Sequence, residues 1–328
     1  MSVAVEIDAV IEEIRTAQKF FLTTHENPDG DALGSLLGMH ELLKQLGKDS
    51  VMFLAAEEFP LPWEYRKMPL DEVQNEPPAD LDQRTVMFLD CGNIDRMPVD
   101  FLQRDGIHIV NIDHHHDNTR FGTVNLVDAH ASCTAEIVWE IAKELGADMT
   151  PAIGDPLYVG LVTDTGKFMY TNTRARSHQM AAELMDAGID AHAIYRRLYE
   201  ELPYARLLLL SRALNAVERF DGGVVTATSL TRADFEETGS VETDSEGIVD
   251  HLRAVEGTKV AVLVRELLSD DRTGIRKLSL RSTDGTVDVS RIARGLGGGG
   301  HRQAAGASSD LPLEELLATI RKEIQEQL

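Results

Sequence analysis

Short apolar runs rich in β-branched residues alternate with longer segments of helical periodicity over residues 1–190. The apolar runs, which we expect to be strands, lie at 20–24, 51–54, 85–89 and 107–112. The helical segments lie at 32–46, 134–145, 151–161 and 176–187, and the Pro-rich segment 59–82 is expected to be a surface loop. Because strands alternate with helices, this region is predicted to be an α/β domain with a doubly wound, mostly parallel sheet.

A second pattern of apolar and polar positions begins after residue 190. Residues 191–217 carry apolar side chains at helical spacing, including the four leucines Leu207–Leu210, and are predicted to be a helical connector. Further strands are expected at 224–229, 259–267 and 277–281, and helices at 245–255, 289–296 and 313–326. The sequence therefore predicts a first domain at 1–190, a connector at 191–220 and a smaller α/β domain at 221–328.

The composition of the chain limits which molecules it is expected to bind and where it is expected to work. The formal net charge of −23 repels polyanions, so long nucleic acid is not an expected partner. No apolar run approaches the roughly 20 residues that span a membrane, and residues 1–19 are expected to form an amphipathic helix rather than a signal peptide. The two cysteines, Cys91 and Cys133, are typical of a reducing compartment and are expected to be free thiols. We therefore expect a cytoplasmic protein.

Acidic and imidazole side chains follow the expected strands. The loop after 20–24 contains His25, Asp29 and Asp31, Asp90 follows 85–89, and the triplet 113–115 (Asp-His-His) follows 107–112. Another acid lies in the Thr163–Gly166 segment. The carboxyl ends of parallel strands meet at one edge of a sheet, where ligands bind in open α/β folds. Six of these residues are candidate metal ligands: His25, Asp29, Asp31, Asp90, His114 and Asp164.

This donor set points to two divalent cations. Carboxylate and imidazole ligands suit Mn²⁺, Co²⁺, Fe²⁺ and Zn²⁺, and the excess of oxygen donors favours Mn²⁺, with Mg²⁺ as a further candidate. Two such ions can clamp a phosphoryl group. A single Asp in a loop is usually a cap or turn residue, and Asp31 is well placed as the N-cap of the helix at 32–46. Capping does not explain six converging groups, because buried carboxylates repel one another.

The C-terminal domain contains a glycine run, Gly297 to Gly300, followed by His301. Backbone without Cβ atoms can approach an anion closely and direct N–H groups toward it. An arginine at the end of a preceding strand can bind phosphate through two hydrogen bonds. The substrate-binding candidates are therefore Arg281, Gly298, Gly299, Gly300 and His301. A flexible linker is the alternative interpretation of the glycines.

Four motifs occur in the order of the DHH phosphoesterase superfamily, which the chain resembles. They are His25-x-Asn-Pro-Asp29-x-Asp31-Ala-x-Gly-Ser35, Asp90-Cys-Gly, Asp113-His-His115 and Thr163-Asp164-Thr-Gly166. The glycine run with His301, followed by Ala304-Ala-Gly306, is similar to the signature of the associated C-terminal domain. Length and motif set are most like the bifunctional oligoribonuclease and 3′-phosphoadenosine 5′-phosphate (pAp) phosphatase group, also called nanoRNases.

The resemblance implies a role for each motif residue. One metal would be held by His25, Asp29 and Asp90, and the second by Asp31, His114 and Asp164, with Asp90 bridging both. His115 would position or protonate the phosphate or the leaving group, and Asp113 would orient the imidazoles. Ser35 would support the first motif by hydrogen bonding, and Gly34 would allow close helix packing.

The implied activity is hydrolysis of very short oligonucleotides, such as linear 5′-phosphorylated diadenylate (pApA), to mononucleotides, with removal of the 3′-phosphate of pAp. The resemblance also implies a homodimer and a cleft between the two domains. Cyclic-di-AMP hydrolysis is one alternative. A manganese inorganic pyrophosphatase is another, although its C-terminal domain lacks the glycine–His signature. A RecJ-type exonuclease would carry further nucleic-acid-binding domains. A non-catalytic nucleotide sensor is disfavoured because all six candidate ligands and His115 are present.

Overall fold

The computed structural model describes residues 2–97, 99–104, 106–269, 272–300 and 302–328. The chain divides into two compact units, which meet in sequence between Glu201 and Leu202. Each unit has its own sheet and its own apolar core. The α/β class predicted for both parts of the chain is confirmed.

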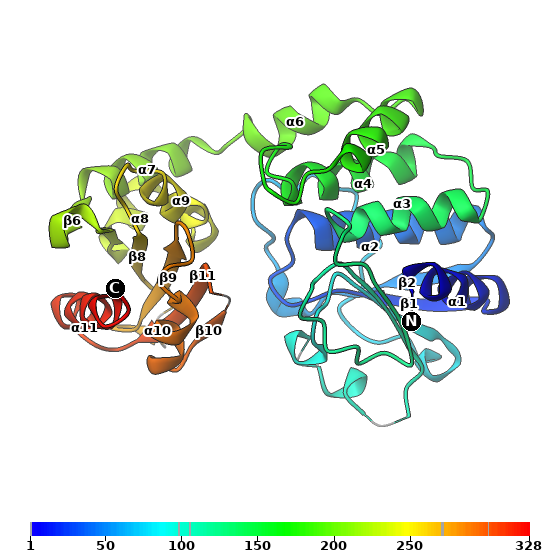
Figure 1. The fold of residues 1–328 in the computed structure, drawn as a ribbon, viewed down its shortest axis with the longest axis horizontal. Coiled ribbons are helices and arrows are strands. Elements are labelled where there is room, and N and C mark those ends of the chain that lie inside the picture. Colours follow the sequence, from blue (N-terminus) through cyan, green and yellow to red (C-terminus); the bar gives the residue numbers. More distant parts are fainter. Residues whose placement is uncertain (1, 98, 105, 270–271, 301) are drawn as a thin grey trace. The chain divides into compact units, whose positions relative to one another are not determined.

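The first unit is built on a five-stranded parallel sheet (Figure 1). Its strands are β1 (Lys19–Thr23), β2 (Asp49–Met52), β3 (Thr85–Leu89), β4 (Ile109–Asp113) and β5 (Val124–Val127). They lie in the order β2-β1-β3-β4-β5. Strand β2, which comes next in the chain after β1, lies on one side of β1, and β3 lies on its other side. The loops after β1 and β3 therefore diverge at a topological switch point, where open α/β sheets bind their ligands.

Helices cover one face of this sheet. They are α1 (Val3–Thr16), α2 (Gly30–Gln45), α3 (Thr134–Glu144), α4 (Pro151–Asp164), α5 (Ala175–Asp186) and α6 (Ala191–Tyr199). Alternate strand residues such as Leu22, Met87 and Ile112 pack into the core beneath these helices. Tyr65 and Met68, from the segment expected to be surface loop, are buried in the same core.

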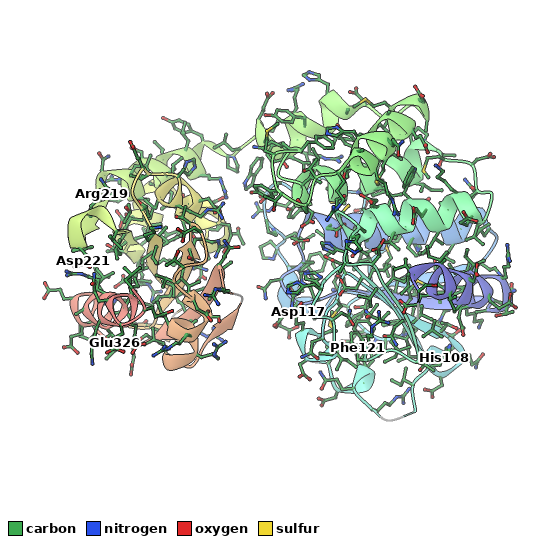
Figure 2. The ribbon with its side chains drawn as sticks, viewed as in Figure 1. His108, Asp117, Phe121, Arg219, Asp221 and Glu326 are labelled. Carbon is green, nitrogen blue, oxygen red and sulfur yellow. The ribbon has the colours of Figure 1, made fainter. Side chains whose placement is uncertain are left out.

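The opposite face of the sheet packs against loops and short 3₁₀ turns. Phe21 and Phe53 lie in this second core with their ring centroids 5.4 Å apart. Phe88 contacts Phe121 edge-to-face at 5.2 Å, and Phe121 is labelled in Figure 2. Cys91 also lies in this core. It and Cys133 are both buried and unpaired, which confirms the expected free thiols.

The contact between α2 and α4 depends on glycine. A Cβ atom on Gly34 would lie 2.4 Å from the carbonyl oxygen of Pro156 and 2.9 Å from the backbone nitrogen of Gly160. A Cβ atom on Gly160 would in turn lie 2.8 Å from a carboxylate oxygen of Asp31. The two helix backbones therefore touch, and the close packing expected at Gly34 is present.

The second unit contains a six-stranded mixed sheet in the order β10-β11-β9-β8-β7-β6. The strands are β6 (Glu218–Phe220), β7 (Val225–Leu230), β8 (Val260–Glu266), β9 (Arg276–Ser282), β10 (Gly299–Gly300) and β11 (Ala304–Ser309). Among the described strands of this sheet, β7 and β8 pair in parallel and the other neighbours pair antiparallel. The helices are α7 (Tyr204–Asn215), α8 (Arg232–Thr238), α9 (Ile248–Arg253), α10 (Val289–Gly295) and α11 (Leu313–Gln325).

Several elements differ from the sequence-based expectation. The helical stretch expected at 191–217 is two helices, because Pro203 lies directly before α7 as its N-cap and cannot continue a preceding helix. The strand expected at 107–112 begins two residues later, at Ile109, and ends one residue later, at Asp113. The strands β5, β6, β10 and β11 and the helix α8 were not predicted. Among the described residues, no helix has the length and apolar character needed to cross a bilayer.

Candidate metal centre

The loop after β1 brings His25, Asp29 and Asp31 to the start of α2. Asp29 is the N-cap of this helix, and its Oδ1 accepts hydrogen bonds from the backbone N–H groups of Asp31 (3.0 Å) and Ala32 (3.1 Å). The expectation that Asp31 caps the helix is wrong, because α2 begins at Gly30, one residue before Asp31. Asp29 is exposed, whereas the His25 side chain is buried.

Asp31 instead directs its carboxylate into the protein, where it is 1% exposed. One oxygen accepts hydrogen bonds from Ser35 Oγ (3.2 Å) and the backbone N–H of Ala135 (2.9 Å). The other accepts from the backbone N–H of Thr134 at 2.6 Å. Thr134 and Ala135 begin α3, so the positive end of that helix faces the carboxylate. The hydrogen bond from Ser35 is the support expected for the first motif.

Asp90 follows β3 with a left-handed backbone conformation, φ 57°. Non-glycine residues adopt this conformation infrequently, and it often marks a functional position. Here the backbone N–H of Asp90 donates to Ile112 O at 3.0 Å, and Oδ1 accepts from Thr134 Oγ1 at 2.9 Å. His25 Nε2 lies 3.6 Å from Asp90 Oδ2. The loops after β1, β3 and β4 thus converge on one buried carboxylate.

The end of β4 supplies Asp113, His114 and His115. Asp113 is buried, and its Oδ1 lies 2.8 Å from His115 Nδ1 while its Oδ2 accepts from Asn118 Nδ2 at 2.6 Å. Asp113 therefore fixes the orientation of the His115 ring. His114 Nε2 lies 3.6 Å from Asp90 Oδ1, 3.8 Å from Asp31 Oδ2 and 3.9 Å from Asp164 Oδ2.

The six predicted ligands all lie in this one cluster. Among the described residues, three groups of three have donor atoms within 4.8 Å of one another. They are His25, Asp29 and Asp90; Asp31, His114 and Asp164; and Asp90, His114 and His115. Asp90 belongs to two of the groups, and so does His114. Nitrogen and oxygen donors at this spacing fit divalent cations.

The charges of the cluster support the same conclusion. Burial, followed by the charges of Asp90 and Asp164, raises the pKa of Asp31 well above its usual range. Burial likewise raises the pKa of Asp164 to about 7. Burial would also raise the pKa of Asp90, but hydrogen bonding to His25 and the charge of His114 lower it below the usual range. Carboxylates that repel one another this strongly are stabilised when a cation binds between them.

The same acidic side chains shift the pKa values of the neighbouring imidazoles. Burial lowers the pKa of His115, but the hydrogen bond to Asp113 and the charge of Asp90 outweigh burial and raise it to about 9. Burial also opposes protonation of His25, and again Asp90 raises its pKa overall. Without bound cations, His115 therefore carries a proton at neutral pH.

Sequence reasoning missed the residues that hold the cluster in place. Thr134 contacts both Asp31 and Asp90. Asn118 binds Asp113, and Asn172 Nδ2 donates to Asp164 Oδ2 at 3.0 Å and to Ser132 O at 2.9 Å. Thr and Asn are common on any surface, so only the start of a helix at 134 gave a signal, as a source of N–H donors.

The substrate-binding candidates lie in the second unit. Gly299 and Gly300 form β10 and pair with Gly306 and Ala305 of β11, so the linker interpretation does not describe them. A Cβ atom on Gly298 would lie 2.2 Å from Gly306 O, which gives this glycine a packing role.

Two further candidates complete this set. Arg281, in β9, has its Nε atom 3.9 Å from Asp250 Oδ1. His301 lies outside the described residues. Substrate binding by the five residues stays a prediction.

Family models and known proteins resemble this chain over most of its length. Residues 19–161 match the model of the DHH family, N-terminal domain, and residues 228–328 match the DHHA1 domain. The chain is similar to the bifunctional oligoribonuclease and PAP phosphatase NrnA of Thermus thermophilus, with 34% identity over 93% of this chain and 90% of that protein. The Bacillus subtilis protein of the same name is 28% identical over 91% and 92%. The solved structure of an exopolyphosphatase-related protein from Bacteroides fragilis has a TM-score of 0.88 at 24% identity and covers 98% and 96% of the two chains.

Proposed function

The chain belongs to the DHH family, and from this premise we propose that it is a metal-dependent phosphoesterase of very short oligonucleotides. Its substrates would be linear dinucleotides such as pApA, hydrolysed to mononucleotides, and pAp, from which it would remove the 3′-phosphate. The relatives named as oligoribonuclease and PAP phosphatase support this choice, since they match more than nine-tenths of the chain.

The observation that carries the proposal is the position of Asp90. Its carboxylate is shared by two groups of candidate ligands, one with His25 and Asp29 and one with His114 and His115. His114 in turn connects to Asp31 and Asp164. We propose that His25, Asp29 and Asp90 hold one divalent cation, and that Asp31, His114 and Asp164 hold a second, with Asp90 bridging them. Two divalent cations supply Lewis acidity toward phosphate oxygens and lower the pKa of water.

His115 and Asp113 would act on the substrate beside these ligands. Asp113 accepts the Nδ1 proton of His115, so Nε2 is the ring nitrogen that can face a phosphate or a leaving oxygen. A protonated His115 can donate a hydrogen bond to a phosphate oxygen and a proton to the leaving group. Asp113 stabilises the imidazolium and keeps its orientation, because Asn118 holds the other carboxylate oxygen.

Manganese is our proposal for the native metal, because oxygen donors outnumber nitrogen donors in the ligand set. We further propose that Arg281, Gly298, Gly299, Gly300 and His301 bind the part of the substrate away from the hydrolysed bond, that the protein is a homodimer, and that it works in the cytoplasm. Light scattering tests the dimer, which should have twice the chain mass of 36.2 kDa. A monomer mass would contradict it.

Turnover of defined substrates tests the function. Wild-type protein is incubated with pApA, pAp, cyclic di-AMP and pyrophosphate, each with Mn²⁺ and with chelator. We expect rapid, Mn²⁺-dependent release of mononucleotide from pApA and slower release of phosphate from pAp. Preferential hydrolysis of pyrophosphate or cyclic di-AMP would replace the proposed substrate class. Tight nucleotide binding that persists with chelator and produces no turnover would identify a sensor instead.

A further inference from the structure

Arg96 lies at the edge of the candidate metal centre, on the loop that follows Asp90. It ends the short 3₁₀ turn Ile94–Arg96. Its carbonyl oxygen accepts a hydrogen bond from the backbone N–H of Glu26 at 2.6 Å, so Arg96 is fixed beside the residue that follows His25. This contact joins the loop after β3 to the loop after β1.

The same loop also lies against the end of β4. A Cβ atom on Gly92 would be 3.6 Å from His115 Cβ and 3.7 Å from Asp113 Oδ2. The backbone N–H of Thr119 donates to Gly92 O at 2.8 Å. Residues 91–96 therefore form one side of the cluster, between the loops that carry His25 and His115.

The positive charge of Arg96 is felt at both of those imidazoles. Burial lowers the pKa of His25 and of His115, and the Arg96 charge lowers each further, against the larger effect of the neighbouring aspartates. The backbone of Arg96 lies on the side of the cluster where His25 and His115 lie. A cation on this side is unusual among so many acidic groups.

Arg96 is half-buried, and its side chain makes no hydrogen bond or ion pair with any residue that the structure describes. Two other partly buried arginines of the first unit form ion pairs, whereas the Nε of Arg197, also partly buried, has no hydrogen-bond partner among the described residues. Arg84 contacts Asp49 and Asp80, and Arg176 contacts Glu136 and Glu140. A guanidinium has five N–H donors, and those of Arg96 are not among the buried side-chain atoms without a partner, so they reach solvent and are open to a ligand. An anionic ligand would satisfy them.

We propose that Arg96 binds the phosphate group that is hydrolysed, from the side of the cluster formed by His25 and His115. The inference rests on the proposed function, because it takes a phosphoester as the ligand. The planar guanidinium matches two non-bridging phosphate oxygens in a bidentate contact, which a lysine ammonium cannot reproduce. The same group would serve phosphodiesters and phosphomonoesters, since both present two such oxygens.

Three variants test the proposal. Arg96→Ala removes the guanidinium and Arg96→Lys keeps only the charge. Arg104→Ala is the matched control, because Arg104 is an exposed arginine further along the same connection that pairs with Asp82. For pApA and pAp with Mn²⁺, we expect kcat/KM to fall about thirtyfold or more in Arg96→Ala, less in Arg96→Lys, and less than twofold in the control. Metal content should match wild type in all three.

Addition of guanidinium ion separates binding from a structural role. Millimolar guanidinium should restore part of the activity of Arg96→Ala and have no such effect on Arg96→Lys or wild type. Unchanged kcat/KM in Arg96→Ala, or a loss of activity that follows loss of bound metal, would overturn the proposal. Circular dichroism checks folding, and if Arg96→Ala does not fold, Arg96→Lys against Arg104→Ala decides the outcome.

Inorganic phosphate distinguishes this proposal from the proposed function. Calorimetric titration of phosphate into Mn²⁺-loaded protein should give at least tenfold weaker binding to Arg96→Ala than to wild type. Absence of turnover on every substrate would refute the proposed function, while this titration would still decide the role of Arg96. Equal affinity in the two proteins, or no phosphate binding to wild type, would overturn the inference.

Discussion

At the residue scale, Asp90 combines a left-handed backbone with a buried carboxylate that three loops approach. His25 and His114 nitrogens each lie 3.6 Å from it, and Thr134 hydrogen bonds to it. Capping a helix or forming a turn would not require a buried carboxylate with contacts from three loops. The proposed role as a ligand shared by two cations would account for both its conformation and its surroundings.

Replacement of Asp90 by asparagine tests this sharing. Asn tolerates the same left-handed conformation, so Asp90→Asn removes charge with little backbone strain. We expect both cations to be lost together and activity to fall more than about a hundredfold. Elemental analysis measures the metal, and Asp95→Asn, at an exposed position on the same loop, is the control. Two retained metals per chain would refute the bridging role.

The titration of the cluster makes a second prediction, for metal-free protein. Asp31 and Asp164 have raised pKa values in the folded protein. Their contribution to folding stability is therefore complete only below the ordinary aspartate pKa. It is lost as pH rises, and for Asp164 this loss extends to a pH of about 7. His25 and His115 also have raised values, and their contribution is lost as pH rises from about 6.5 through about 9 for His115. All four groups therefore lower the folding stability of the metal-free protein as pH rises.

Metal-free protein should therefore unfold at a lower temperature at pH 8.5 than at pH 5.5, by about 5 °C. Asp90 and Asp113 have lowered pKa values and affect stability only as pH falls below the usual aspartate range. Saturating Mn²⁺ should remove or reverse the trend, because it favours the deprotonated ligands. Calorimetric scans with chelator and with metal measure this. A metal-free protein that is more stable at pH 8.5 would contradict the electrostatic description.

At the element scale, the contact between α2 and α4 sets the distance between two parts of the site. α2 carries Asp31 in its first turn, and α4 ends at Asp164. Gly34 and Gly160 allow the two backbones to touch, and Gly38 leaves room for the side chain of Leu157. Larger residues would separate the helices and with them the two carboxylates.

Gly34→Ala should therefore lower both stability and metal affinity. Its Cβ would meet backbone atoms of α4, which cannot rotate away, so we expect a loss of about 2–3 kcal/mol in unfolding free energy. Gly295→Ala is the control: it lies in α10 with nothing within 4 Å of its Cβ and should be neutral or stabilising by up to about 1 kcal/mol. Urea denaturation followed by circular dichroism measures both. Equal stability of Gly34→Ala and wild type would contradict the packing argument.

At the scale of the whole molecule, the two units carry different parts of the proposed chemistry. All six candidate metal ligands lie in the unit that ends at Glu201, and the glycine-rich strand lies in the other. Each apolar cluster formed by the described residues belongs to one of the two units. The chain carries a net charge of −23, so a small substrate would depend on local cations rather than on the overall field.

Separate cores predict separate folding. A fragment of residues 1–201 should fold and bind the same number of Mn²⁺ ions as the full chain, and a fragment of residues 202–328 should fold without tight Mn²⁺ binding. The first fragment should have a kcat/KM for pApA at least tenfold lower than the full chain, because the proposed binding residues of the second unit are missing. Circular dichroism, elemental analysis and turnover test these outcomes. Loss of metal from the first fragment would contradict the assignment of all ligands to one unit.

The sequence by itself determined the α/β class, most strands and helices, and the six residues that meet at the sheet edge. These follow from local signals: hydrophobic periodicity predicts each element, and short motifs place five of the six residues after strands and Asp164 at the end of a helix. Only the tertiary structure decided that Asp29 rather than Asp31 caps α2, and that Asp31 faces the start of α3. It also decided the roles of Thr134, Asn118 and Asn172, and the position of Arg96 beside the loop of His25. The physical reason is that these contacts join segments far apart in the chain, and helix packing on the sheet sets their geometry rather than any local pattern of residues.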